Sequence, residues 1–97
     1  MITIHAIKKP NKHHGKSGNR RLRAANLLPA IIYGGNKESI SIILDLNKIT
    51  KLQNQKEFYN EPLNIIIDGQ KNHVKIQEIQ HHPFKPLILH VDFIRIE

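Results

Sequence analysis

Apolar side chains recur at every second position in several short stretches of this chain. A two-residue period is typical of strands that bury one face, because successive side chains of a strand point to opposite sides. Together with short buried-type runs, the stretches of strand character number six: residues 2–7, 30–33, 39–44, 62–67, 73–80 and 87–96. A closed or nearly closed barrel hides the edges of such a set best. The pattern predicts a mainly β fold, a six-stranded antiparallel β-barrel with two or three short helices, in a single domain over residues 1–97.

Two details near the C-terminal half can be predicted from individual residues. The dipeptide Asp68-Gly69 accepts the left-handed dihedrals of a tight turn, so the strands on either side of it should form a hairpin. In the second of these strands Val74 and Ile76 share one face, but the next apolar residue is Ile79. This change of phase predicts a β-bulge near residues 77–78.

Alternation divides the last strand into a core face and a partly polar face. The predicted core face carries Leu87, Leu89, Val91 and Phe93. The predicted opposite face carries Ile88, His90, Asp92 and Ile94.

Short helices are predicted between the strands. Asn19 can accept a backbone N–H as an N-cap, and the residues after it are mostly good helix formers up to the breaker Pro29, with Leu22 toward the protein body. A second helix is predicted over residues 48–53, because two apolar residues lie three apart there on one face.

Positive charge is concentrated in the first third of the chain. Residues 1–37 contain eight Lys or Arg and no acidic residue, whereas residues 38–97 contain seven basic and eight acidic residues, so the whole excess of +7 (8 − 1) lies in the first part. Within it, residues 10–19 are rich in Pro, Gly, Ser and Asn, which predicts a flexible basic loop. Such a cluster favours a polyanionic partner, and the alternative is a set of solvated lysines that reflects composition alone.

Composition narrows the class of partner and the compartment. With no cysteine and no apolar stretch of about 20 residues, neither a disulfide-rich secreted protein nor a membrane protein is expected, and an intracellular location is favoured. A chain of 97 residues holds one modest core, so a binding surface for a larger partner fits better than a deep substrate pocket. Three Phe and two Tyr give no aromatic platform for single strands, which favours a structured RNA.

Catalysis and metal binding are the other chemistries to weigh. His90 and Asp92 lie two apart on one strand face, which suits a hydrogen-bonded pair as well as acid–base catalysis, and no Ser or Cys nucleophile is close in sequence. The adjacent histidines at 13–14 and 81–82 would point to opposite faces of a strand and could not readily chelate one metal. We favour a solvated loop and a turn before Pro83 for these pairs. The prediction is therefore no enzyme, no small-molecule substrate, no cofactor and no metal.

Four motifs occur in order along the chain: Gly15-Lys16 followed by residues 20–23 (Arg-Arg-Leu-Arg), residues 29–35 (Pro-Ala-Ile-Ile-Tyr-Gly-Gly), residues 82–86 (His-Pro-Phe-Lys-Pro) and residues 90–93 (His-Val-Asp-Phe). In this combination the chain resembles, over essentially its whole length, the short form of the bacterial large-subunit ribosomal protein twenty-five family, which is related to the general stress protein CTC. The resemblance implies a six-stranded antiparallel barrel similar to the anticodon-binding barrels of glutaminyl-tRNA synthetase. It also implies a non-catalytic structural role in the cytoplasmic ribosome, in which a protein that is monomeric when free binds the loop E region of 5S rRNA beside other large-subunit rRNA and proteins.

The resemblance further implies which residues contact RNA. The expected set, carried over by motif together with the basic residues Lys9 and Lys85, is Lys9, Lys16, Asn19, Arg20, Arg21, Arg23, Tyr33, Gln77, Gln80, His81, Lys85, His90 and Asp92. Lys and Arg would hold phosphates, while the strand face could read base edges and 2′-hydroxyls. Asp92 could accept from a base amino group or orient His90. The chain departs from typical members at Asn19 and His81, where Ser and Arg are common, and in a longer loop before Arg20.

Two other functions stay open on the sequence alone. One is a nonspecific nucleic-acid binder, for which total charge matters and arrangement does not. The other is a small hydrolase or isomerase that uses His90 and Asp92.

Overall fold

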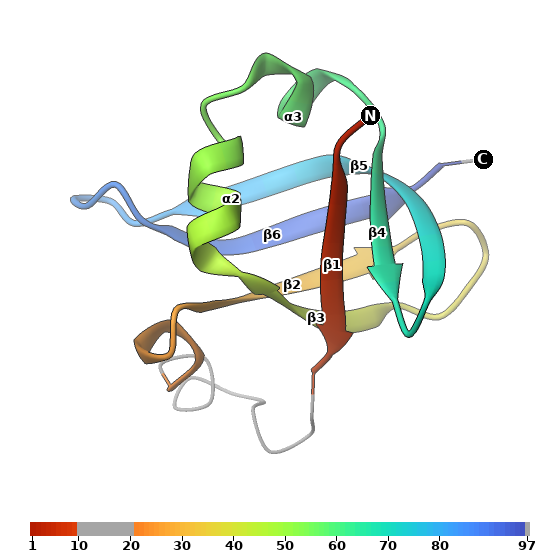
Figure 1. Ribbon diagram of the computed structural model, residues 1–97, viewed down its shortest axis with the longest axis horizontal. Helices are drawn as coiled ribbons and strands as arrows, with labels where there is room; N and C mark the ends of the chain where they lie inside the picture. Colours follow the sequence, from red (N-terminus) through yellow and green to blue (C-terminus); the bar gives the residue numbers. More distant parts are fainter. Residues whose placement is uncertain (10–20, 97) are drawn as a thin grey trace.

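The computed structural model describes residues 1–9 and 21–96, which form a β-barrel with short helical connections (Figure 1). The elements are β1 (Thr3–Lys8), β2 (Leu27–Tyr33), β3 (Ile40–Asp45), α2 (Leu46–Leu52), α3 (Lys56–Asn60), β4 (Leu63–Ile67), β5 (Gln70–His81) and β6 (Ile88–Arg95). A further helical segment covers residues 21–24. The strands close in the order β1-β3-β2-β6-β5-β4. The predicted mainly β class with a closed six-stranded barrel is confirmed; the predicted flexible loop lies outside the described residues.

The barrel is mixed, so the prediction of a wholly antiparallel barrel was wrong. β1 pairs in parallel with β4, and β2 pairs in parallel with β6. The cause is the long connection from β1 to β2, which returns the chain to the end where β1 began, so both strands run in one direction on either side of β3. Four strands then run one way and two the other, and a closed ring of that composition must contain parallel neighbours.

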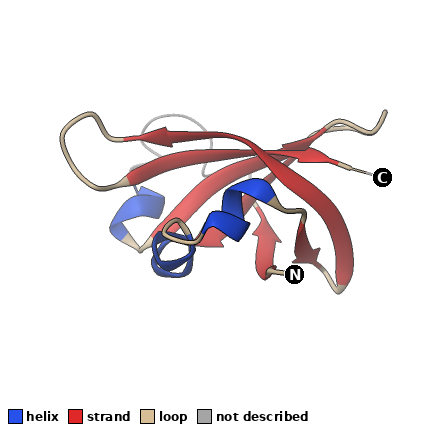
Figure 2. Ribbon diagram, turned by 90° about the horizontal axis from the view of Figure 1, so that it is seen from above, coloured by secondary structure: helices blue, strands red, loops and turns tan. Residues whose placement is uncertain are grey.

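The connection between β3 and β4 forms part of the core. The side chain of Asp45 accepts two backbone N–H groups in the first turn of α2, as an N-cap does. Leu46 and Ile49 of α2 and Phe58 of α3 belong to the same buried cluster as the inward side chains of the strands. Figure 2 shows the helices gathered on one side of the strands. The barrel interior is therefore completed by helical residues and not by strand residues alone.

Two local predictions about β5 are confirmed. Asp68 (φ 52°) and Gly69 (φ 79°) are both left-handed and make the tight turn between β4 and β5. The register between β5 and β6 shifts between Ile76 and Glu78, which is the predicted bulge.

A second irregularity in the same ladder was not predicted. Gln80 pairs with His90 and His81 pairs with Ile88, so Leu89 is skipped. Ile88 thereby turns into the core, where it is 1% exposed, and Leu89 is half-buried. The predicted faces of these two residues were wrong because a second bulge changes the phase of alternation between them and His90.

The first helix is shorter than predicted. Helical structure ends at residue 24, and Asn26 adopts a left-handed φ of 61° before β2 begins at Leu27. Pro29 lies inside β2, but before the ladder with β6 begins at Ala30, where a missing N–H costs least. The prediction that Leu22 faces the protein body is confirmed, since its side chain is 2% exposed.

Candidate nucleic-acid interface

Strands β5, β6 and β2 are neighbours and present one outer face of the barrel (Figure 1). Along β6, Val91 and Phe93 are fully buried, so the alternating residues point outwards. We call the outward residues of these three strands the β5–β6–β2 face. It comprises Lys75, Gln77, Glu78, Gln80, His90, Asp92, Ile94, Ile31 and Tyr33.

Strand register decides which side chains are neighbours on this face. Gln80 lies opposite His90, and Glu78 lies opposite Asp92. On the other side of β6, Ile31 of β2 lies beside Asp92. Directly opposed side chains of antiparallel strands have Cβ atoms about 5 Å apart, so the polar groups of β5 and β6 can address one ligand surface together.

His90 and Asp92 form a hydrogen-bonded pair on the face. The Nδ1 atom of His90 lies 2.8 Å from Oδ1 of Asp92, and each side chain is 31% exposed. Nδ1 must carry a proton to donate to the carboxylate, which leaves Nε2 as an acceptor on a neutral ring and as a donor on a protonated one. Of the two roles open for Asp92, its contact supports the orientation of His90.

The bulge in β5 displays a glutamine. Because the register shifts between Ile76 and Glu78, the residue between them, Gln77, is the extra residue of the bulge, and it is exposed. An extra residue re-aims its side chain relative to the regular alternation. Gln77 and Gln80 therefore offer amide donors and acceptors at two separate points of the face.

The β5–β6 hairpin projects beyond the barrel at one end (Figure 1). Nδ1 of His82 accepts the backbone N–H groups of Phe84 and Lys85, both at 3.1 Å, and the N–H of His82 donates to the carbonyl of Leu87 at 2.8 Å. The turn interpretation is thus confirmed for His82 and was wrong for His81, which is the last residue of β5 and pairs with Ile88. Lys85 and Phe84 are exposed at the tip, and His81 is exposed at the end of β5.

Basic side chains lie at the same end of the barrel as this hairpin. Because β2 runs parallel to β6, the segment that leads into β2 lies beside the start of β6. This segment carries Arg21, which is exposed, and Arg23, which is half-buried. Leu22 between them is buried but does not belong to the barrel's core cluster. The three other predicted contacts of this region, Lys16, Asn19 and Arg20, lie outside the described residues.

Lys9 is not part of the β5–β6–β2 face. It follows β1, and its backbone N–H donates to the carbonyl of Ser41 in β3 at 2.9 Å. Since β3 and β2 separate β1 from β6, Lys9 lies about 14 Å around the barrel from β6 at the usual strand spacing. Partial burial lowers the pKa of its ammonium group below the usual value.

The structure brings Tyr33, Gln77, Gln80, His90 and Asp92 together on one face, as the expected set requires. It adds residues that sequence reasoning missed, namely Lys75, Glu78 and Ile31; Ile94 lies on the face where alternation along the last strand predicted it. Lys75 and Glu78 could have been predicted to point outwards, if the alternation along this strand had been shifted by one residue at the predicted bulge. Ile31 could not have been found, because only the pairing of β2 with β6 brings it beside the polar residues.

The described part of the chain gives no support for a metal site or for a membrane-spanning helix. Among residues 1–9 and 21–96, no group of three or more His, Cys, Asp or Glu side chains is placed to hold a metal ion. None of the helices in these residues has the length and apolar character to cross a membrane.

Comparisons with known proteins agree with the motifs. Residues 4–93 match the model of the Ribosomal L25p family. The chain is 47% identical over 95 residues to the large ribosomal subunit protein bL25 of Photorhabdus laumondii, an alignment that covers 98% of this chain and 99% of that protein. This is a family of ribosomal structural proteins rather than of enzymes, and bacterial ribosomes lie in the cytoplasm, so the predicted location is confirmed. The chain is a ribosomal protein and belongs to the Ribosomal L25p family.

Proposed function

We propose that this chain is a structural component of the large ribosomal subunit that binds the loop E region of 5S rRNA and catalyses no reaction. The name of its relative, a large-subunit protein, supports the first part. The observation that carries the second is the parallel pairing of β2 with β6, which sets Arg21 and Arg23 at the end of the polar row formed by Gln80 and His90. Cations for phosphates and hydrogen-bonding groups for bases thus lie next to each other.

The two parts of the interface bind different parts of the RNA in this proposal. Arg21, Arg23 and Lys85 hold phosphates, because guanidinium and ammonium groups form charge-assisted hydrogen bonds with them. The centre of the face carries the carboxylates of Glu78 and Asp92, which repel phosphates. These acceptors suit the donors that an RNA minor groove displays, which are 2′-hydroxyls and the amino group of guanine.

The remaining expected contacts belong to the same proposal. Lys16, Asn19 and Arg20 lie outside the described residues, and the proposal assigns them to the phosphates together with Arg21 and Arg23. In the assembled subunit the neighbours are 5S rRNA and other large-subunit rRNA and proteins, and the free protein is a monomer that consists of one domain.

Two double variants separate specific from nonspecific binding. The labelled RNAs are a 5S rRNA fragment that contains loop E and a random duplex of equal length, and affinity is measured by fluorescence anisotropy over a series of salt concentrations. Arg21→Ala with Arg23→Ala should weaken both complexes alike and reduce the salt slope by about one per lost phosphate contact. Gln80→Ala with His90→Ala should remove the preference for loop E and leave the salt slope unchanged.

The matched control is Lys51→Ala with Lys56→Ala, which removes two exposed charges from α2 and α3. It should retain the preference for loop E. If this control weakens binding as much as the arginine pair does, and the Gln80 and His90 pair has no effect, total charge governs binding and the chain is a nonspecific binder.

A further inference from the structure

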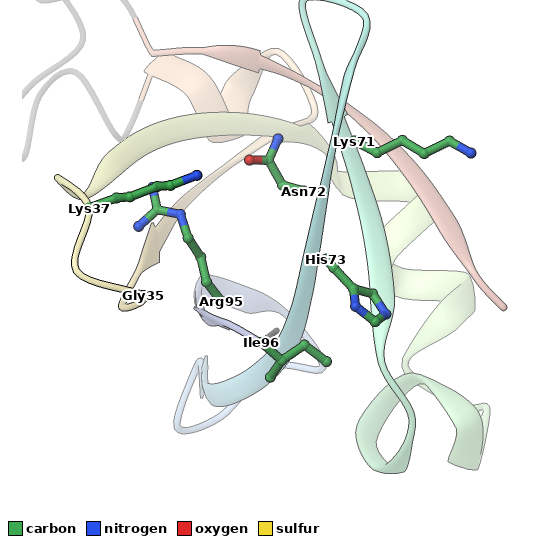
Figure 3. A pocket seen from close by; sticks show the side chains of 7 residues that line it. All are labelled: Gly35, Lys37, Lys71, Asn72, His73, Arg95 and Ile96. Carbon is green, nitrogen blue, oxygen red and sulfur yellow. The ribbon is translucent and has the colours of Figure 1, made fainter.

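A second basic site lies at the end of the barrel opposite the β5–β6 hairpin. There, the turn after β2, the end of β6 and the start of β5 surround a pocket of about 160 Å³ (Figure 3). Lys37 and Arg95 line one side of it, and Lys71 and His73 line the other. No residue of the predicted RNA-contact set lines this pocket.

The positive charges of this pocket are not neutralised within the described residues. Within residues 1–9 and 21–96, no carboxylate forms an ion pair with Lys37, Lys71 or Arg95. The neighbouring residue Glu38 contributes its backbone carbonyl to Arg95, and its side chain is not among those that line the pocket. Cations that share a pocket repel one another, and a bound anion removes that cost.

Arg95 is held in place before any ligand arrives. Its Nη1 donates to the carbonyl of Gly34 at 2.7 Å, and its Nη2 donates to the carbonyl of Glu38 at 2.8 Å. A guanidinium group has five N–H donors, so these two bonds leave three for a ligand. A side chain that is already fixed loses little conformational entropy when it binds.

We propose that this pocket binds a phosphate group. A fixed guanidinium fork beside an exposed ammonium group is the donor set that matches a tetrahedral oxyanion. Lys37 supplies this ammonium group, since it lies beside Arg95 in Figure 3, whereas Lys71 extends away from Arg95 and adds positive charge at the rim of the pocket. Asn72 does not take part, because its side-chain amide donates to the carbonyls of Ile65 and Gln70.

The site is distinct from the one proposed for loop E. Ile96, which directly follows β6, is six residues from His90, and that is about 20 Å in an extended chain. A phosphate bound here is therefore supplied by a different stretch of RNA backbone or by free phosphate. The proposal does not depend on 5S rRNA binding.

The test is a titration of the full chain with inorganic phosphate at constant ionic strength, followed by the backbone amide signals in NMR spectra. We expect saturable shifts confined to residues 34–38, 71–73 and 95–96. Lys37→Ala with Lys71→Ala should weaken the binding at least tenfold, and Lys51→Ala with Lys56→Ala should leave it unchanged. Shifts that are linear, scattered over the surface or equally lost in the control would overturn the proposal.

Two further probes test the chemistry of the ligand. Acetate at equal concentration should not saturate the same amides, and a poly-glutamate peptide should not bind there more tightly than phosphate. Equal saturation by acetate would make this a general anion pocket, and tighter binding by the peptide would assign it to a protein partner, so either result contradicts the proposal.

A third experiment, binding of the 5S rRNA fragment over a series of salt concentrations, identifies the source of the phosphate. If the Lys37 and Lys71 pair lowers the salt slope of that complex by about one unit per contact, the phosphate belongs to the same RNA. If the slope is unchanged while binding of inorganic phosphate is lost, the phosphate comes from another RNA segment or from the free anion.

Discussion

Arg95 joins two parts of the barrel end through backbone carbonyls. Its two amino groups reach Gly34 and Glu38, which lie 61 and 57 residues earlier in the chain. Through these bonds β6 holds the turn between β2 and β3. The residue thus has a structural role in the free protein, whatever the pocket beside it binds.

Replacement of Arg95 by Ala should lower the free energy of unfolding by about 1–3 kcal/mol, because two carbonyls lose hydrogen bonds from a charged donor, one of them partly buried. Arg95→Lys should recover only part of this loss, since an ammonium group cannot span both carbonyls in a fork. The measurement is urea unfolding followed by circular dichroism. Lys37→Ala is the matched control in the same pocket and should change stability by less than about 0.5 kcal/mol; an equal loss in both variants would argue against the carbonyl bonds.

At the residue scale, the sequence predicts what lies on one strand but not what lies across strands. Alternation along β6 predicted that His90 and Asp92 share an outer face, and the structure confirms this. The neighbours Glu78 and Ile31 depend on register. The contacts of Arg95 depend on closure of the barrel, and no local pattern carries that information.

The two turns with left-handed glycines differ in their surroundings. Gly34 has a φ of +92°, and a Cβ there would lie 3.0 Å from Cγ1 of Ile94. Gly69 has a φ of +79°, and a Cβ there would meet nothing within 4 Å. The first turn therefore needs glycine for space and for dihedral angle, and the second needs it for dihedral angle alone.

Gly69→Ala should cost about 1–2 kcal/mol, which is the strain of a left-handed residue with a Cβ. Gly34→Ala should cost roughly 1 kcal/mol more, because Ile94 must also move. Thermal unfolding of the two variants side by side measures the difference. An equal loss of stability at both turns would mean that the Ile94 side chain moves away from an added Cβ at position 34 without measurable cost.

At the element scale, local turn chemistry could be predicted and long connections could not. Asp68 and Gly69 specify their hairpin because both adopt positive φ. Propensity predicted the first helix over the residues before the breaker Pro29, but helical structure ends at residue 24, Asn26 is left-handed, and β2 begins at Leu27. The parallel pairs follow from the crossover between β1 and β2, whose path the hydrophobic pattern does not specify.

For the molecule as a whole, a substitution of the buried residue Phe58 in α3 tests whether the helical connection and the strands unfold together as one core. Phe58 is fully buried in the barrel cluster, whereas Phe84 at the tip of the β5–β6 hairpin is 92% exposed. Phe58→Ala should lower stability by about 3–5 kcal/mol in a single transition. Phe84→Ala should change it by less than about 0.5 kcal/mol.

Calorimetry, with comparison of the calorimetric and van 't Hoff enthalpies, checks this prediction. If α3 unfolded separately, Phe58→Ala would split the transition in two and the barrel would keep its melting temperature. A marked loss with Phe84→Ala would show instead that the hairpin packs against the body.

The order of the strands has a consequence for synthesis of the protein. β6 is the strand that joins β2 to β5, so a nascent chain that ends before residue 88 can form only an open sheet in the order β5-β4-β1-β3-β2, with two bare edges. His90 and Asp92 lie on that missing strand. An incomplete chain therefore lacks His90 and Asp92, which form the centre of the proposed RNA-binding face. This part of the face can form only after β6 has been synthesised.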